Sequence, residues 1–338
     1  MNQIMKSKTI SQLALLYPIL AQGVENTILK DAAQKSVEAN KWFDFESIDY
    51  SIKALSLWMK EENLTDFASR YTFTNNPKTI AVICAGNIPL VGFHDMLCVL
   101  LSGHIFYGKL SSDDKFLLPA IAEILFEIDS EFKNRIFFTE GKIEGFDAVI
   151  ATGSNNTSRY FEYYFGKYPN IIRHSRTSVA VLDGNEKNID KLAIDILTHK
   201  GLGCRNVSKI FIPRGYNFKE LVQSFQKFNF LLDHNKYRNN YDYHKTIYIM
   251  NTIPFIDTTN CILLENEELF SPVSVVYYEY YDCIEDVKTK LDLFKENIQC
   301  VVSEIKEIEN SIPLGKAQEP TIFDFADNID TMKFLNSL

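Results

Sequence analysis

Short apolar runs alternate with amphipathic stretches from residue 79 onward, and this alternation restricts the chain to few folds. Residues 79–85 (TIAVICA) form a continuous apolar run, as expected for a strand buried on both faces. Similar runs follow at 104–110, 135–140 and 147–153, and helical spacing fills 88–103 and 113–129, the latter with acidic residues in its first turn. The order predicts a parallel, doubly wound sheet that binds its ligand at the carboxyl ends of the strands.

A second series of strands and helices begins near residue 178. Strands are predicted at 178–184, 208–215 and 272–281 and helices at 188–201, 218–228 and 284–297, whereas the Tyr- and Asn-rich stretch 233–251 gives no clear assignment. Residues 1–75 have mostly helical spacing. We therefore expect an α/β protein with a helical N-terminal segment and a Rossmann-type cofactor domain (1–177 with 310–338), and a smaller α/β catalytic domain (178–309).

Composition narrows the classes of partner. The 338 residues carry a formal net charge of −9 and no Lys/Arg-dense stretch, which argues against nucleic acid. Six cysteines without a CxxC pair argue against a metal site and for a reducing compartment. No stretch approaches the roughly twenty apolar residues of a membrane span, and polar residues interrupt the apolar start of the chain, as in an amphipathic helix rather than a secretory signal. We expect a cytoplasmic protein with no metal and no membrane span.

One cysteine stands in a context that permits two interpretations. Cys204 lies in GLGCRN (201–206), just before an apolar strand. Most lone cysteines are small buried packing residues. A nucleophilic thiolate needs a base or positive potential nearby, and Arg205 alone is weak support for one.

Four further motifs contain residues that suit a ligand site. Asn87 (in GNIPL) follows the first strand, where its amide can face a ligand or merely complete a turn. Lys109 (in YGKLSS) follows the second strand, where dinucleotide folds place the adenosine ribose, although a solvated lysine is the commoner case. The small residues Gly153 and Ser154 close the fourth strand and let a cofactor approach the backbone. Glu268 (in ELFSPV) has no distinctive context by itself, and the chain has no GxGxxG motif.

In this order the five motifs resemble those of the aldehyde dehydrogenase superfamily. They are similar to its Asn-x-Pro turn, Lys-Pro-Ser-Glu, Thr-Gly-Ser, Gly-Gln-x-Cys and Glu-Ile-Phe-Gly-Pro-Val segments. Within the superfamily the chain resembles the LuxC-like acyl-CoA reductases, the fatty-acid reductases of bacterial luminescence and their non-luminous relatives. Its tail, GKAQEPTIFDFADNIDTMKFL (315–335), resembles that branch in particular. The resemblance covers most of the chain from about residue 75 onward.

The resemblance implies a role for each motif residue. Cys204 falls on the catalytic thiol, and Asn87 falls on the side-chain donor of the oxyanion hole, partnered by the backbone N–H of Cys204. The implied cofactor contacts are Lys109 at the adenosine ribose, Gly153 and Ser154 near the nicotinamide, and Glu268 at the nicotinamide ribose.

Two departures from the superfamily pattern bear on reaction and cofactor. Hydrolytic members carry a catalytic Glu in a Glu-Leu-Gly-Gly-Lys-Ser segment, where this chain has Arg173–Ser178 (RHSRTS), without a carboxylate. Hydrolysis of a thioester needs a base that activates water, whereas reduction does not. Ser112 stands where NAD-preferring members often have Glu, and a neutral residue near Lys109 tolerates a 2′-phosphate, which favours NADPH with NADH as the alternative.

The resemblance therefore implies an NADPH-dependent reductase that converts a fatty acyl thioester to the aldehyde through an acyl-cysteine. The acyl donor would be a fatty acyl-CoA or an acyl-carrier or acyl-transfer protein, and the enzyme a homo-oligomer. Two alternatives stay open: an aldehyde dehydrogenase that uses another base, such as His174, and a catalytically silent scaffold for an acyl-transfer partner.

Overall fold

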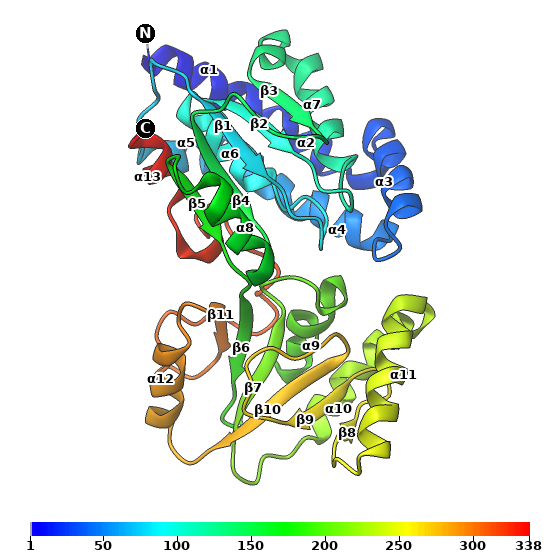
Figure 1. The fold of residues 1–338 in the computed structure, drawn as a ribbon. Helices are drawn as coiled ribbons and strands as arrows, with labels where there is room; N and C mark the ends of the chain where they lie inside the picture. The colour runs from blue at the N-terminus through cyan, green and yellow to red at the C-terminus, as the bar shows by residue number, and fades with distance from the viewer. Residues whose placement is uncertain (1) are drawn as a thin grey trace. The chain divides into compact units, whose positions relative to one another are not determined.

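The structure, a computed structural model, describes residues 2–338 and divides into two compact units. The first unit is Met1–Ser175 with Thr321–Leu338, and the second is Arg176–Pro320. The corresponding boundaries predicted from the sequence are 178 and 310. Each unit contains a mainly parallel sheet with helices packed against it (Figure 1), so the predicted α/β class is confirmed.

The first unit is built on a five-stranded parallel sheet of order β3-β2-β1-β4-β5. Its strands are β1 (Thr79–Ile83), β2 (Ile105–Lys109), β3 (Ile136–Thr139), β4 (Ala148–Thr152) and β5 (Asn170–Arg173). The chain runs outward from β1 to β3, then returns to β4 on the other side of β1. The strand order therefore reverses between β1 and β4, and this switch point is where doubly wound sheets bind ligands.

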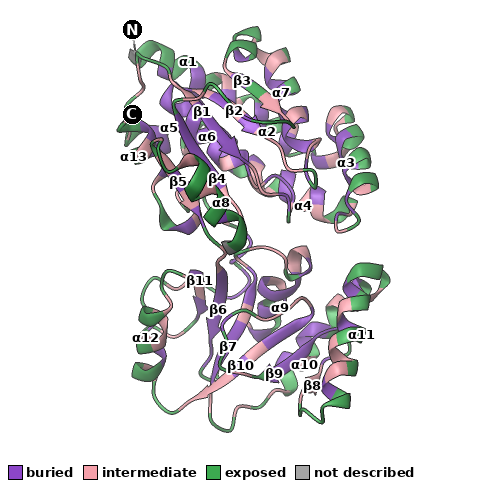
Figure 2. Ribbon diagram, in the orientation of Figure 1, coloured by how far each residue is buried: buried purple, intermediate pink, exposed green. Residues whose placement is uncertain are grey.

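Helices connect these strands and cover the sheet. The connecting helices are α6 (Phe93–Ser102), α7 (Leu117–Ile128) and α8 (Asn155–Phe165). The N-terminal segment is helical as predicted, with α1 (Asn2–Ala14), α2 (Leu16–Leu20), α3 (Thr27–Ala39), α4 (Phe45–Ser56) and α5 (Glu61–Ser69), and α13 (Thr331–Asn336) ends the chain. The buried side chains of α1–α7, α13 and one face of the sheet form one continuous core (purple ribbon in Figure 2), whereas Phe161 and Phe165 of α8 pack on the opposite face.

Two predicted helix starts in this unit are wrong. The helix expected over 88–103 begins only at Phe93, because Leu90 adopts a left-handed conformation (φ 64°) that ends any helical geometry before it. The helix expected over 113–129 begins at Leu117, so its acidic residues precede it rather than occupy its first turn. Asp114 is instead buried, and its carboxylate accepts a hydrogen bond from the Leu90 N–H at 2.7 Å.

The second unit contains a six-stranded sheet of order β11-β6-β7-β10-β9-β8, in which only the β8–β9 pair is antiparallel. Its strands are β6 (Thr177–Val181), β7 (Val207–Pro213), β8 (Ile256–Asp257), β9 (Ile262–Glu265), β10 (Val275–Tyr281) and β11 (Ile298–Ser303). Its helices are α9 (Ile189–Leu197), α10 (Lys219–Phe225), α11 (Asn235–Met250) and α12 (Ile284–Leu293).

Helix α11 is the Tyr- and Asn-rich stretch that the sequence left unassigned. Its buried face consists of the tyrosines Tyr237, Tyr241 and Tyr248. A phenol is apolar along its ring and polar at its tip, so a face of tyrosines gives little contrast with the polar residues around it.

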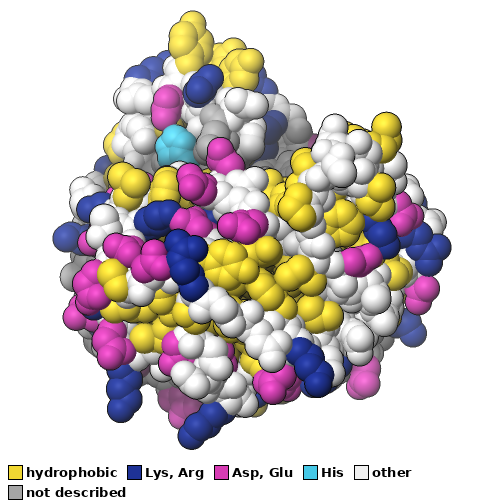
Figure 3. Space-filling model, turned by 90° about the horizontal axis from the view of Figure 1, so that it is seen from below, with side chains coloured by type: hydrophobic (Ala, Val, Ile, Leu, Met, Phe, Trp, Pro, Cys, Tyr) yellow, Lys and Arg dark blue, Asp and Glu magenta, His cyan; other side chains and the backbone are white. Residues whose placement is uncertain are grey.

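The surface mixes side chains of different character. Acidic, basic and apolar side chains are interspersed on the face shown in Figure 3. Within the described residues, no helix is both long and apolar enough to cross a membrane.

Candidate active site

Cys204 lies in a short loop of the second unit, residues 202–206, which we call the thiol loop. The loop directly precedes β7, and the chain enters it from α9 through three consecutive left-handed residues, His199, Lys200 and Gly201. Left-handed backbone is unfavourable for His and Lys, so surrounding contacts must hold this entry in place.

Asn206 supplies much of that support. Its side chain is buried, and its amide N–H groups donate to the carbonyls of Thr198 at 2.7 Å and Ile196 at 3.0 Å, near the end of α9. Its amide oxygen accepts a hydrogen bond from the Gly203 N–H at 2.8 Å, directly before Cys204. A single buried amide therefore joins the end of α9 to the thiol loop.

The neighbouring strand β6 supports the other end of the loop. The Ser178 hydroxyl donates to the Cys204 carbonyl at 3.0 Å, and the Ser178 N–H donates to the Asn206 carbonyl at 3.1 Å. The same hydroxyl accepts a hydrogen bond from the backbone N–H of Cys300 on β11 at 3.3 Å. The backbone around Cys204 is thus fixed while its side chain stays exposed.

Exposure separates Cys204 from most of the other cysteines. Of the six, all within the described residues, Cys204 and Cys283 are exposed. Burial raises the pKa of Cys84 and Cys98, and raises the pKa of Cys261 to about 12, which disfavours their reactive thiolates. The interpretation of Cys204 as a buried packing residue is therefore wrong, and Cys283 provides a natural comparison for its reactivity.

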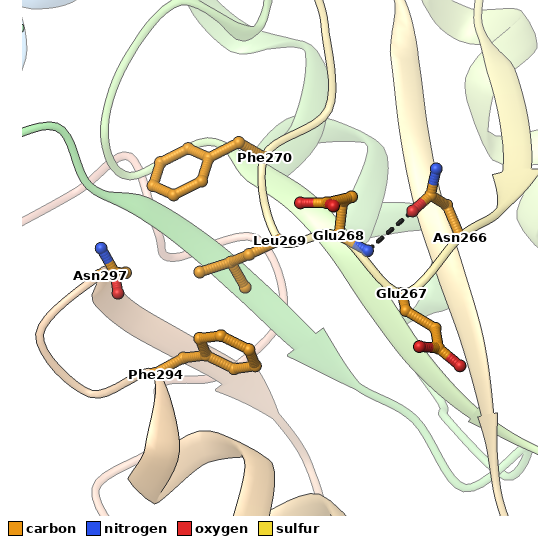
Figure 4. A pocket seen from close by; sticks show the side chains of 7 residues that line it. All are labelled: Asn266, Glu267, Glu268, Leu269, Phe270, Phe294 and Asn297. Atoms are coloured by element: carbon orange, nitrogen blue, oxygen red, sulfur yellow. Dashed lines mark hydrogen bonds between the residues drawn. The ribbon is translucent and has the colours of Figure 1, made fainter. Parts of the chain in front are cut away.

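Glu268 lies in a turn between β9 and β10 that lines a pocket of about 360 Å³ in the second unit. Its backbone N–H donates to the Asn266 side chain at 2.7 Å, and its own side chain is exposed (Figure 4). One wall of the pocket is apolar, formed by Leu269, Phe270 and Phe294 (Figure 4). The pocket thus combines an apolar surface with a carboxylate, a combination that suits a ligand with both a flat ring and hydroxyl groups.

Two further contacts fix this turn against β7. The Ser208 hydroxyl donates to the Leu269 carbonyl at 2.8 Å, only four positions after Cys204. The buried Lys209 ammonium donates to the Asn266 carbonyl and lies 2.7 Å from the Glu279 carboxylate. Burial lowers the pKa of Lys209 to about 8, with the nearby Lys290 adding to the effect. Within this unit the structure therefore connects the Glu268 turn and the thiol loop through the first residues of β7.

The remaining predicted residues belong to the first unit and lie along one edge of its sheet. Asn87 follows β1, Lys109 ends β2, and Gly153 and Ser154 follow β4. Because these strands are parallel and in register, with Ile83 opposite both Lys109 and Ala151, the four residues meet at the carboxyl edge beside the switch point.

The individual side chains at this edge differ in their exposure and in their contacts. Asn87 and Ser112 are exposed. The Lys109 ammonium is half-buried and donates to the Gly141 carbonyl at 2.5 Å. Ser154 caps α8 by accepting a hydrogen bond from the Thr157 N–H at 3.3 Å. Amide, ammonium and hydroxyl groups at a sheet switch point fit the sugar and phosphate groups of a dinucleotide.

Glycine is required at two turns of this edge by close packing. A Cβ at Gly86 would lie 2.6 Å from the Ser111 hydroxyl, and one at Gly153 would lie 2.9 Å from the Phe161 ring. Gly86 lets the turn before Asn87 pack onto the loop that contains Ser112. Gly153 lets α8 approach β4, a role that the sequence analysis did not assign to it.

The buried ion pair of Asp95 and Arg173 has no local signal in the sequence. The guanidinium donates to both carboxylate oxygens at 2.7 Å, and also to the Thr331 hydroxyl at 3.0 Å. Arg173 is the first residue of the RHSRTS segment, and here it joins β5 to the first turn of α6. Its partner is 78 positions away in the chain, and no local pattern connects the two.

His174, the alternative base, is exposed. Its imidazole lies 3.8 Å from the Glu162 carboxylate, and its backbone N–H donates to Asp327 at 3.1 Å. Among residues 2–338 there is no group of three or more His, Cys, Asp or Glu side chains that could hold a metal ion.

Comparison with solved structures defines the class of fold. Aldehyde dehydrogenase 21 of Physcomitrella patens is 11% identical over 100% of this chain and 84% of its own (TM-score 0.69). AldA, the indole-3-acetaldehyde dehydrogenase of P. syringae, is 11% identical over 93% and 74% (TM-score 0.67). A propionaldehyde dehydrogenase of Clostridium phytofermentans is 12% identical over 94% and 82% (TM-score 0.59). The chain thus has the aldehyde dehydrogenase fold, as the motifs predicted.

The family follows from the sequence match. Residues 51–227 match the family described as acyl-CoA reductase (LuxC), a segment that includes Asn87 and Cys204. The chain therefore belongs to the LuxC acyl-CoA reductase family, whose chemistry is that of oxidoreductases acting between acyl and aldehyde groups. No curated protein matches the chain.

Proposed function

We propose that this protein reduces a fatty acyl thioester to the aldehyde, with Cys204 as the nucleophile and NADPH as the reductant. The observation that carries the proposal is the exposed Cys204 thiol on a backbone fixed by Asn206 and Ser178, within the segment that matches the acyl-CoA reductases. A held backbone with an exposed thiol suits attack on a bound carbonyl, because positioning lowers the entropic cost of that step.

The reaction would proceed in two stages on Cys204. The thiolate attacks the thioester carbonyl, its sulfur forms the new acyl–S bond, and CoA leaves as its own thiolate. When bound, reduced nicotinamide supplies the hydride that converts the acyl group to the aldehyde level. The carbon–sulfur bond to Cys204 then breaks, which frees the aldehyde and returns the thiolate. In this scheme Asn87 would donate to the developing oxyanion, the role that the resemblance implies.

The residues proposed to contact the cofactor lie in both units. The P. syringae structure contains NAD+, and this chain shares its fold. Lys109 and Ser112 would contact the adenosine ribose and its 2′-phosphate, Gly153 and Ser154 would lie near the nicotinamide, and Glu268 would accept hydrogen bonds from the nicotinamide ribose. The absence of a carboxylate from Arg173–Ser178 favours reduction over hydrolysis, since the segment lacks the Glu that activates water in hydrolytic members of the superfamily.

Mass spectrometry of the intact protein tests the nucleophile. Incubation with a fatty acyl-CoA should add one acyl group, and NADPH should then remove it with release of the aldehyde. Cys204→Ala should abolish the adduct, whereas Cys283→Ala, which removes the other exposed thiol, should retain it. An adduct on the Cys204→Ala protein would place the nucleophile elsewhere, release of free acid would indicate a dehydrogenase, and neither adduct nor turnover would indicate a scaffold.

The proposal also includes the acyl donor and the oligomeric state of the protein. An acyl-CoA and an acyl-carrier or acyl-transfer protein both present a thioester that Cys204 could attack, and comparing acylation rates with the two donors would identify the better one. Family resemblance also implies a homo-oligomer, which the mass of the native protein in solution would reveal.

A further inference from the structure

A buried carboxylate holds the C-terminal part of the second unit against the thiol loop. Asp195, near the end of α9, is fully buried, and its two carboxylate oxygens accept hydrogen bonds from the backbone N–H groups of Gly315 at 2.6 Å and Ala317 at 2.8 Å. We call residues 315–318 the strap. Burial raises the pKa of Asp195 to about 6, and the hydrogen bonds from the Gly315 and Ala317 N–H groups, together with the nearby Arg205, oppose that rise.

The strap also contacts the thiol loop and α9 directly. The Arg205 guanidinium, one residue after Cys204, donates to the Ala317 carbonyl at 2.5 Å. The Gln318 side chain donates to the Asp195 backbone carbonyl at 3.3 Å. A Cβ at Gly315 would lie 2.9 Å from that of Lys191, and Gly315 has a φ of +83°, so only glycine allows the strap this close to α9.

Together these hydrogen bonds join α9, the strap and the thiol loop to one another. Asp195 holds the strap, the strap holds Arg205 of the thiol loop, and Asn206 returns from the loop to the carbonyls at the end of α9. Each link attaches to backbone, so loosening one segment removes a restraint on the others. Neither the mechanism proposed above nor the motif resemblance uses Asp195 or the strap contacts.

We propose that Asp195 is a positioning residue for Cys204, which it holds in place for attack through the 315–318 strap and Arg205. The proposal deepens the function proposed above, since it gives the thiol loop its geometry without touching substrate. It predicts that the strap and the thiol loop open together and not independently.

Hydrogen exchange of the full-length protein tests this coupling without reference to catalysis. In Asp195→Asn one of the two backbone N–H groups faces an amide N–H instead of an oxygen, so peptides that cover 315–318 and 202–206 should both exchange about tenfold faster. The control is Asp190→Asn, an exposed acid on the same helix that pairs with Lys227, which should change neither peptide. Faster exchange confined to 315–318, or unchanged exchange in both, would overturn the proposal.

A second variant keeps the test decisive if Asp195→Asn does not fold. Arg205→Lys retains the positive charge beside Cys204 but loses the guanidinium N–H that reaches Ala317, and it should speed exchange of 202–206 and 315–318 together. A fully folded Arg205→Lys protein with parental exchange in both segments would contradict the proposal.

Acylation of Cys204 supplies the functional readout. At saturating acyl-CoA, Cys204 of the Asp195→Asn protein should be acylated about tenfold more slowly than Cys204 of the parent. Alkylation of Cys204 by iodoacetamide, measured relative to Cys283 in the same protein, should stay within about twofold of the parental rate, because alkylation requires only access. Parental acylation by the variant would overturn the positioning role. If the parent itself is not acylated at Cys204, the proposed function fails, whereas the exchange result still decides the coupling.

Discussion

Asp114 shows how one buried side chain can determine the pH dependence of the first unit. One carboxylate oxygen accepts the Leu90 N–H, which holds the turn after Asn87, and the other has no hydrogen-bond partner. Burial raises the pKa of Asp114 from its ordinary 3.8 to about 7, because no cation offsets the loss of water. The folded protein therefore binds this proton more tightly than the unfolded chain does.

The sign of the resulting pH effect follows from that difference. Between about pH 4 and pH 7 the folded state holds more protons at Asp114, so its contribution to the free energy of unfolding falls as the pH rises. Asp114→Asn keeps an acceptor for Leu90 and removes the buried charge. At pH 8 the variant should be more stable than the parent by about 2 kcal/mol, and at pH 5, where the unfolded carboxyl is still ionised, the gain should fall to less than half of that.

Urea unfolding at both pH values measures the effect of Asp114→Asn. The matched control is Asp113→Asn, an exposed neighbour, which should change the free energy of unfolding by less than about 0.5 kcal/mol. A variant that is destabilised equally at pH 8 and pH 5 would show that hydrogen bonding by the carboxylate outweighs its burial.

At the scale of elements, long and strongly patterned segments were predictable and contacts between distant segments were not. Continuous apolar runs identified β1, β2 and β4, and the motifs at their ends led to Asn87 and Lys109. Strands β5, β8, β9 and β11 were missed, because short apolar stretches outside a regular alternation resemble loop sequence.

The candidate site shows the same division. Cys204 and Glu268 were predicted from local motifs, whereas Asp195, Asn206 and the Asp95–Arg173 pair were not. Their roles depend on partners brought together by the fold; Asp195, for example, contacts Gly315, which is 120 positions later. A buried acid with a distant backbone partner has the same local sequence as an exposed acid on a helix, so sequence periodicity does not reveal it.

The loop after β2 is the element that would select the cofactor. Ser112 is exposed in this loop, and Lys109 ends the strand before it. If both contact the adenosine ribose, Ser112→Glu would place a carboxylate against the 2′-phosphate of NADPH and near a hydroxyl of NADH. The ratio of kcat/KM for NADPH to that for NADH should fall at least about tenfold, because like charges repel and the phosphate loses solvent.

Ser112→Gln is the control for that substitution, because it adds similar bulk without charge and should alter the ratio much less. A parent enzyme that prefers NADH, or a Ser112→Glu ratio equal to that of the parent, would show that another part of the chain recognises the 2′-phosphate.

At the scale of the whole molecule, the first unit is completed only by the last residues of the chain. After passing through the second unit, the chain returns at Thr321, and α13 buries Met332 and Leu335 in the core of the first unit. Its Thr331 hydroxyl accepts from Arg173, and the Leu335 carbonyl lies 3.0 Å from the imidazole of the buried His104. Residues 1–175 therefore lack part of their own core until the rest of the chain has been made.

This arrangement predicts that a small cavity in the terminal helix weakens parts of the first unit that are far away in the sequence. Met332→Ala removes a fully buried side chain and should lower the free energy of unfolding by about 2–5 kcal/mol. Lys333→Ala, at the exposed neighbouring position on the same helix, should change it by less than about 0.5 kcal/mol. Chemical unfolding measures the change in free energy for both variants, and hydrogen exchange of the native proteins shows which elements lose protection. In Met332→Ala the protection of β1 and α6 should fall with that of α13, since they share one core, and loss of protection in α13 alone would mean that the terminal helix is an independent attachment.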